Sequence, residues 1–223
     1  MAKIRTLTQL QEALDNEMSW RVKEISTFKF AAKTKGLTQK TFVRAGIALL
    51  YAHWEGFIKG ASEDYLGYVD SRAHFYRDLK SCFAVFGLKG KLVILTESKK
   101  SKASIEAFDF VLAEMDKTAR MAMSSAIDTE SNLTSKVFSN IAISLDISTA
   151  PYEMRFNLID ESLVSRRNRV AHGEYLDLDS DDFVALADAI IQIMRDYKTD
   201  IENAASLEGY KRPRAAVGEF LPA

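Results

Sequence analysis

Apolar residues recur at three- and four-residue steps along the first part of the chain, which is the spacing of one face of an α-helix. The pattern predicts a helix from Thr6 or Thr8 to about residue 33. Its stripe contains Leu7, Leu10, Leu14, Met18, Val22, Ile25 and Phe28. Thr8 and Glu12 resemble an N-terminal capping box, although their spacing is one residue too long. Gly36 is typical of the residue that follows a helix C-terminus.

Residues 39–66 predict a second helix, which is apolar nearly all round. Its apolar residues include Phe42, Ala45, Ile47, Ala48, Leu49, Leu50, Tyr51, Trp54, Phe57 and Ile58. A helix without a polar face is expected at the centre of a bundle. Thr38 is of a type that caps helices, and we expect it to cap this one. Gly46, Gly56 and Gly60 weaken the helix unless neighbouring elements pack closely against them.

The middle of the chain carries a less regular pattern. Residues 68–87 are rich in aromatic side chains and predict one helix or two short ones. The glycines of residues 87–91 are expected to end that region. Residues 92–95 are the only β-like run, and we interpret them as a loop or a short helical turn. A further apolar stripe predicts a helix over residues 104–124.

The last third of the chain predicts three more helices. Thr134 is expected to cap a short one, and residues 153–171 form the next. Gly173 then suits the end of that helix. The acidic residues of 178–182 suit the positive N-terminus of a final helix, which ends near Ala204.

Taken together, the pattern predicts an all-α protein. We expect residues 1–205 to form a single helical domain and residues 206–223 to form a C-terminal tail that is partly ordered at best. Three prolines and ten glycines in 223 residues are too few for a β-sandwich with many turns.

Composition adds limits on partners and location. The net charge of −1 gives no global attraction to nucleic acid or to an anionic membrane, so binding of RNA needs a local basic patch. The single cysteine, Cys82, suits a reducing compartment. No apolar run approaches the ~20 residues that span a bilayer. The N-terminus lacks the apolar region of a signal peptide. We therefore expect a cytoplasmic protein that does not associate with membranes.

One short segment concentrates the residues that could do chemistry. Residues 164–174 hold three arginines, an asparagine and one of only three histidines. The chain has no Gly-rich phosphate loop and no HExxH, CxxC or GxSxG motif, and its histidines lack metal-ligand spacing. We therefore expect no metal and no cofactor. A plain interpretation of the segment is a surface helix end, with arginines lying over apolar surface and a histidine near the negative end of the helix dipole.

The functional interpretation of this segment is a site for a polyanionic substrate. Arg167 offers a planar, permanently charged fork for a phosphate. His172 can transfer a proton near neutral pH. Asn168 could hydrogen-bond a phosphate oxygen or hold the histidine ring in one tautomer. Arg166 and Arg169 would bind substrate by adding local positive charge.

Helix geometry indicates that one copy of the segment is an incomplete site. Arg167 and His172 are five residues apart, which separates them by about 140° around a helix. Cleavage of RNA by its own 2′-hydroxyl needs a base and an acid, but the segment has one histidine. A two-fold pairing of two chains would bring two arginines and two histidines into one cleft, and two-fold dimers are the commonest assembly.

The sequence also resembles a known family. Arg167 and His172 have the R-(polar)-x-x-x-H form of the HEPN superfamily of nucleotide-binding domains. The string LV-x-x-RN-x-V-AHGE at residues 163–174 is similar to a segment of the RiboL-PSP-type HEPN proteins of bacteria, as is LLYAHWEGFIK at residues 49–59. Asn132-Leu133 and residues 201–204 add weaker likenesses, so that the resemblance spans roughly residues 20–210.

This resemblance implies a HEPN-type helical bundle with additional helices, assembled as a two-fold homodimer. It also implies a metal-independent endoribonuclease that leaves a 2′,3′-cyclic phosphate, in a toxin–antitoxin or anti-phage defence role, with an antitoxin or defence-system protein as partner. Arg167 and His172 take the catalytic positions and Asn168 the polar one, with no departure from the motif. Some HEPN domains have lost activity. The alternatives are therefore a non-catalytic module that binds nucleotide, RNA or protein, and a helical partner of a toxin.

Glu55 is unusual because it is a carboxylate on an almost wholly apolar helix. If it is buried it needs a partner, and an arginine of the segment is a candidate, which would make Glu55 a support for the site. An exposed or purely structural Glu55 is the other interpretation. We expect the neighbouring Trp54 in the core and His53 in a structural role.

Overall fold

The computed structural model describes residues 4–36, 38–122 and 126–213, and these are all-α, as the sequence predicts. Its elements are α1 (Leu7–Ala32), α2 (Gln39–Ser71), η1 (Tyr76–Asp78), α3 (Ser81–Glu97), α4 (Ser101–Glu114), α5 (Ser135–Ser144), η2 (Ala150–Arg155), η3 (Leu158–Ser165), α6 (Arg166–Ala171) and α7 (Ser180–Ser206). The elements η1 and η2 are 3₁₀-helices, whereas η3 is a π-helix.

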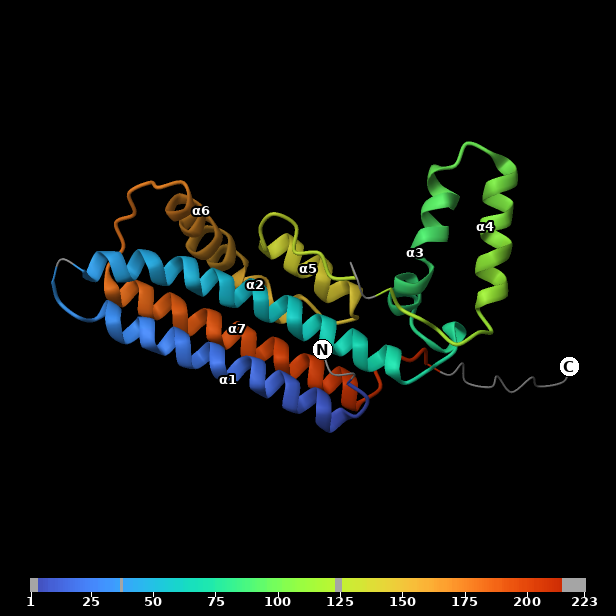
Figure 1. The fold of residues 1–223 in the computed structure, drawn as a ribbon, viewed down its shortest axis with the longest axis horizontal. Coiled ribbons are helices and arrows are strands. Elements are labelled where there is room, and N and C mark those ends of the chain that lie inside the picture. Colours follow the sequence, from blue (N-terminus) through green and yellow to red (C-terminus); the bar gives the residue numbers. More distant parts are fainter. Residues whose placement is uncertain (1–3, 37, 123–125, 214–223) are drawn as a thin grey trace, which may run out of the picture.

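Three long helices form the body of the molecule. Figure 1 shows α1, α2 and α7 side by side along its longest axis. The prediction that the second helix is central is confirmed, because α2 buries residues on nearly all sides, among them Ile47, Trp54, Phe57 and Tyr65. Gly46 has the close packing that its position requires. A Cβ atom there would lie 2.4 Å from Cζ of Phe183 on α7, so only glycine lets that ring approach.

The remaining helices are distributed along the length of the three long ones. Figure 1 shows α6 near one end of the long helices, α5 near the middle, and α3 with α4 at the far end. Ile159 and Leu163 of η3 are fully buried, and they fix the segment that leads into α6. The α6 segment and the α3–α4 hairpin therefore lie at opposite ends of the molecule.

The α3–α4 hairpin differs from the sequence prediction. The helix α3 runs through the glycines of residues 87–91 and includes residues 92–95, which were expected in a break and a loop or turn. A Cβ atom on Gly87 would lie 2.1 Å from the hydroxyl of Tyr76, so close packing uses this glycine inside the helix. The helix predicted over residues 104–124 instead covers Ser101–Glu114. Residues 118 and 119 pair with the segment around Phe75, and that pairing replaces helical hydrogen bonds.

Three of the four helix starts use residues that the sequence offered for them, since Thr6 was one of the two starts predicted for the first helix. The side chains of Thr134 and Asp179 accept hydrogen bonds from backbone N–H groups, and these caps are confirmed. The first helix is capped by Thr6 with Gln9 in a complete capping box, and not by Thr8. Thr38 makes no capping hydrogen bond because its backbone is already helical.

The segment predicted as one helix over residues 153–171 is three consecutive pieces. A 3₁₀-helix, the π-helix η3 and the short α6 follow one another. The π-helix has more residues per turn than an α-helix, so it rotates the side chains that follow relative to a continuous α-helix. π-Helical turns are frequent at functional sites, and this one leads directly to Arg166.

The chain continues past α7 as a packed segment. Tyr210 is fully buried, and its backbone oxygen accepts a hydrogen bond from the backbone of Lys80 at 2.8 Å. Residues 214–223 of the predicted tail lie outside the described residues. The division into a domain and a tail at residue 205 stays a prediction. Within the described ranges, no helix combines the length and the apolar character needed to cross a membrane.

Candidate functional site

The basic segment is held on the outer side of α2. Leu163 and Val164 at the end of η3 are buried, whereas the polar residues of α6 are half-buried or exposed. The apolar part of the segment anchors it to the bundle. The helix α6, which follows η3, therefore presents its arginines at the surface beside α2.

Arg167 contacts three other side chains, two through hydrogen bonds and one through a cation–π contact. Its Nη1 atom donates hydrogen bonds to Oδ1 of Asn132 and to Oδ1 of Asn168, both at 2.8 Å. The centre of its guanidinium lies 4.1 Å from the centre of the Tyr51 ring on α2. One nitrogen and one face of the guanidinium are thus used to fix its position. Nε and Nη2 donate to no acceptor within the described residues, and they form the two-pronged edge that suits a phosphate.

Tyr51 links this arginine to the loop before α5. Its phenol oxygen accepts a hydrogen bond from the backbone N–H of Leu133 at 2.8 Å. Burial raises the pKa of Tyr51, the Leu133 hydrogen bond and the Arg167 charge oppose that rise, and the nearby Glu55 carboxylate adds to it. Tyr51 is therefore neutral at physiological pH, and it offers a ring face to the cation above it.

Glu55 lies beside Tyr51. It is half-buried, and among the described residues no ion pair joins it to an arginine of the segment. Its carboxylate acts on the Tyr51 phenol, which in turn packs under Arg167. A supporting role for Glu55 stays a prediction, and the geometry gives it an indirect route through Tyr51.

His172 ends α6 and has an exposed side chain. Gly173 follows with φ +74°, in the left-handed region that favours glycine. The backbone N–H of Gly173 bonds to the oxygen of Val170 at 3.1 Å, and that of Glu174 bonds to the oxygen of Arg169 at 2.9 Å. These two bonds form a Schellman motif, so the position of the histidine backbone is well defined while its ring is open to a substrate or a partner.

The two flanking arginines have different environments. Arg169 donates from Nη2 to the backbone oxygen of Tyr175 at 2.7 Å, and its Nε lies 3.3 Å from the carboxylate of Glu174. It therefore stabilises the loop after His172. Arg166 is half-buried and makes no hydrogen bond or ion pair with another described residue. A substrate-binding role for both residues stays a prediction.

The other two histidines are remote from this chemistry. His53 is buried, its ring packs edge-on against Trp20, and its Nε2 lies 3.1 Å from the Glu24 carboxylate. Burial lowers the pKa of His53. His53 thus joins α2 to α1. Burial also lowers the pKa of His74, which packs against Tyr210.

Two residues of the site were not expected from the sequence. Tyr51 and Asn132 position Arg167, yet neither was assigned a role. Both lie in stretches that resemble the family, residues 49–59 and Asn132-Leu133. The signal was therefore present, but only the folded chain brings these stretches against Arg167.

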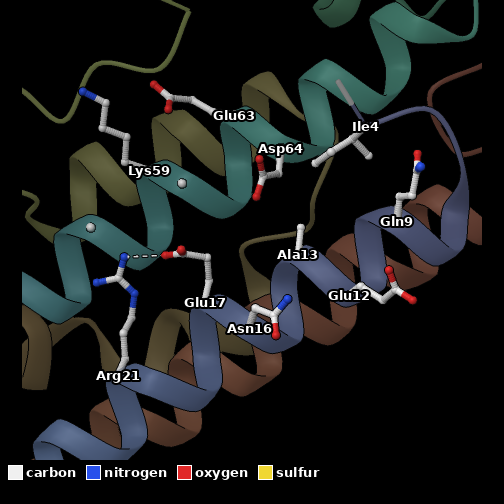
Figure 2. Close-up of a pocket in the computed structure, with 12 residues that line it drawn as sticks. Ile4, Gln9, Glu12, Ala13, Asn16, Glu17, Arg21, Lys59, Glu63 and Asp64 are labelled. Carbon is white, nitrogen blue, oxygen red and sulfur yellow. Dashed lines mark hydrogen bonds and ion pairs between the residues drawn. The ribbon is translucent and has the colours of Figure 1, made fainter. Parts of the chain in front are cut away.

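A separate hollow of about 560 Å³ lies between α1 and α2. None of the predicted site residues lines it. Figure 2 shows Glu17 and Arg21 on α1, with Lys59, Glu63 and Asp64 on α2. Arg21 pairs with Glu17 at 2.7 Å, and its buried Nε has no partner in the part of the chain that the structure describes. Burial, with Glu17 and Glu63 nearby, raises the pKa of Asp64 to about 6.

The arrangement around Arg167 can hold an anion. For proton transfer it offers one histidine, whereas the cleavage reaction needs both a base and an acid. It provides a fixed cation with a two-pronged edge, and an exposed imidazole at the end of the same short helix. Residues of α2 and of the loop before α5 hold the Arg167 side chain, which a surface helix end alone does not require. The plain interpretation of the segment stays an alternative prediction.

Comparison with known proteins adds one result. A sequence profile of the RiboL-PSP-HEPN family matches residues 16–203. No curated protein and no solved structure matches the chain. The match covers the second part of α1, all of α2, the Arg167 segment and nearly all of α7.

Proposed function

The chain belongs to the RiboL-PSP-HEPN family, and from this membership and the geometry of Arg167 we propose that it is a metal-independent endoribonuclease. The observation that carries the proposal is the fixed guanidinium. Asn132, Asn168 and Tyr51 hold it in place while Nε and Nη2 remain for a substrate phosphate. A cation positioned before substrate arrives needs no rearrangement to stabilise charge that develops in the transition state.

The proposed reaction is an internal transfer at phosphorus. The 2′-oxygen of RNA loses its proton to a base and forms a bond to the adjacent phosphorus. The bond from phosphorus to the 5′-oxygen breaks, and that oxygen takes a proton from an acid. The products are a 2′,3′-cyclic phosphate and a 5′-hydroxyl. Arg167 binds the phosphate oxygens, and His172 transfers protons.

This reaction supports a two-fold homodimer as the working assembly. One chain supplies one histidine at the segment, whereas the reaction uses a base and an acid. His172 is exposed at the end of α6, where a second copy could reach it. In the dimer, Asn168 serves mainly to hold Arg167, and Arg166 adds positive charge for the RNA backbone.

Single substitutions at the segment test the proposal. His172→Ala should abolish cleavage of single-stranded RNA while leaving helical content and dimerisation unchanged. Arg167→Lys keeps the charge but loses the planar fork, and it should cut cleavage strongly. Lys102→Ala, at an exposed cation on α4, is the matched control and should cleave at the original rate. Undiminished cleavage by the His172 variant would overturn the assignment.

The mechanism also makes demands on substrate and conditions. Chelators should not inhibit cleavage, DNA should be spared because it lacks the 2′-hydroxyl, and the product ends should be cyclic phosphates. A strict need for Mg²⁺ would contradict the proposal. We further propose a toxin–antitoxin or anti-phage role, with an antitoxin or defence protein as partner. Expression with and without neighbouring genes would test that role by growth arrest.

The second candidate is a non-catalytic module that binds nucleotide, RNA or protein at the same surface. Its support is the His172 side chain, which has no hydrogen-bond partner among the described residues to orient its ring. Incubation of the purified protein with total RNA separates the two candidates. Discrete fragments favour the ribonuclease, and stable binding without fragments favours the module. A third candidate, a helical partner of a toxin, would co-purify with that toxin and would not arrest growth alone.

A further inference from the structure

The segment after His172 presents an exposed aromatic ring. Leu176 and Leu178 are 5% and 7% exposed, whereas Tyr175 between the motif and these anchors is 65% exposed. The buried leucines fix the segment to the bundle. The tyrosine, three residues from the histidine, therefore points away from the core although it is a large and partly apolar side chain.

Hydrogen bonds hold this tyrosine at both ends. Its backbone oxygen accepts from Nη2 of Arg169 at 2.7 Å, and its hydroxyl accepts from Nζ of Lys40 at 3.0 Å. The same Nζ lies 5.6 Å from the centre of the ring. These two distances place the ammonium beyond the hydroxyl and not over a face. The faces of the ring are consequently left uncovered by Lys40.

Cations and carboxylates are interleaved around the ring. Glu174 pairs with Arg169 at 3.3 Å, and Asp177 pairs with Lys40 at 3.3 Å. Arg44 donates to the backbone oxygen of Glu174 at 2.5 Å and pairs with no carboxylate in the described ranges. The carboxylates of Asp179 and Asp182 line the same hollow as Lys40. A nucleic-acid strand that approaches the ring thus meets three cations, Lys40, Arg44 and Arg169, that are already held in place, together with these carboxylates.

We propose that Tyr175 is a stacking platform for an RNA base next to the scissile phosphate. The proposal rests on the ribonuclease function described above. An exposed aromatic face with adjacent cations is the recurring arrangement for binding single-stranded nucleic acid, since every base has a face that can stack. The spacing of three residues limits the Cα atoms of His172 and Tyr175 to about 11 Å apart, so one strand can contact both side chains.

Binding of a non-cleavable probe tests the platform. The probe is a fluorescein-labelled 12-nucleotide RNA with 2′-O-methyl groups, and the readout is fluorescence anisotropy. Tyr175→Ala should weaken binding about tenfold or more, whereas Tyr175→Phe keeps the ring and should bind within about twofold of the original chain. Phe108→Ala removes an aromatic ring, 52% exposed, from α4 at the far end and should not change binding.

The outcomes separate this proposal from the ribonuclease function. Equal binding by Tyr175→Ala and the original chain overturns the platform, whether or not His172 is needed for cleavage. Equal loss in the Phe and Ala variants also overturns it, because the Lys40 hydrogen bond would then be the cause. If the chain never cleaves RNA but the Ala variant alone loses affinity, the platform stands and the catalytic proposal fails. Melting temperatures of both variants should match that of the original chain.

Discussion

The guanidinium of Arg167 lies over the ring of Tyr51, with 4.1 Å between its centre and the centre of the ring. The contact joins the basic segment to the middle of α2, which buries residues on nearly all sides. Because the tyrosine hydroxyl is bonded to Leu133, the same ring also fixes the loop that carries Asn132. One aromatic residue thus positions both the cation and one of its hydrogen-bond acceptors.

Two substitutions at Tyr51 separate these functions. Tyr51→Phe keeps the ring under Arg167 but leaves the buried N–H of Leu133 without its acceptor, which should cost about 1–3 kcal/mol of folding stability. Tyr51→Leu also removes the cation–π contact and should reduce RNA cleavage further. Thermal melts and cleavage rates, measured together, check this. Equal cleavage rates for Phe and Leu would show that the ring face has no role.

Asn132 should matter for activity more than for stability. Asn132→Ala removes one of the two acceptors that fix Nη1 of Arg167, and hydrogen bonds to charged groups contribute about 1.5–3 kcal/mol. We expect RNA cleavage to fall roughly tenfold or more. Asn140→Ala, at an exposed asparagine on α5, is the matched control. A variant with mobile Arg167 but full activity would contradict the idea that a fixed guanidinium is needed.

Gly173 should be sensitive because of its backbone and not because of crowding. Its φ is +74°, and an added Cβ would meet no atom within 4 Å. Gly173→Ala should therefore cost about 1 kcal/mol, the strain of a left-handed residue, and should lower the melting temperature by about 2–4 °C. Gly90→Ala in α3 also meets open space, but in a helix interior, so it should stabilise the fold slightly. Equal shifts for both variants would exclude the backbone explanation.

The sequence predicted the fold class and the family, and both are confirmed. It succeeded where apolar spacing decides the structure, as in α1, α2 and α7. It failed in α3, because local glycine propensity predicts a break while packing of Tyr76 against Gly87 stabilises a continuous helix. It also missed the π-helix before α6, since eight residues are too few to distinguish its period from that of an α-helix.

The candidate site was predictable only in its local part. Arg167, Asn168 and His172 are neighbours in the sequence, so motif and chemistry identify them. Tyr51 and Asn132 belong to other elements and reach Arg167 through tertiary packing. The ties of Arg169 to the Glu174–Tyr175 loop likewise depend on the turn at Gly173. Residue type alone could not show that Arg167 is held by other side chains whereas Arg169 stabilises a loop.

The hollow between α1 and α2 gives a prediction that depends on pH. Folding raises the pKa of Asp64 from 3.8 to about 6, mainly by burial, with Glu17 and Glu63 adding to the effect. The folded state therefore holds a proton that the unfolded state has released between these two pH values. Stability contributed by the neutral carboxyl is present at pH 4 and is lost as the pH rises through 6.

Replacing Asp64 with an uncharged isostere should remove this loss. Asp64→Asn should stabilise the fold by about 1–2 kcal/mol at pH 7.5, a value reduced for the partial exposure of the carboxyl, and should change stability little at pH 4. Urea unfolding at the two pH values checks the difference. Asp109→Asn, at an exposed position on α4, is the control and should show no such dependence. If Asp64→Asn destabilises the fold more at pH 7.5 than at pH 4, the ionised carboxylate has a favourable partner, and the raised pKa is wrong.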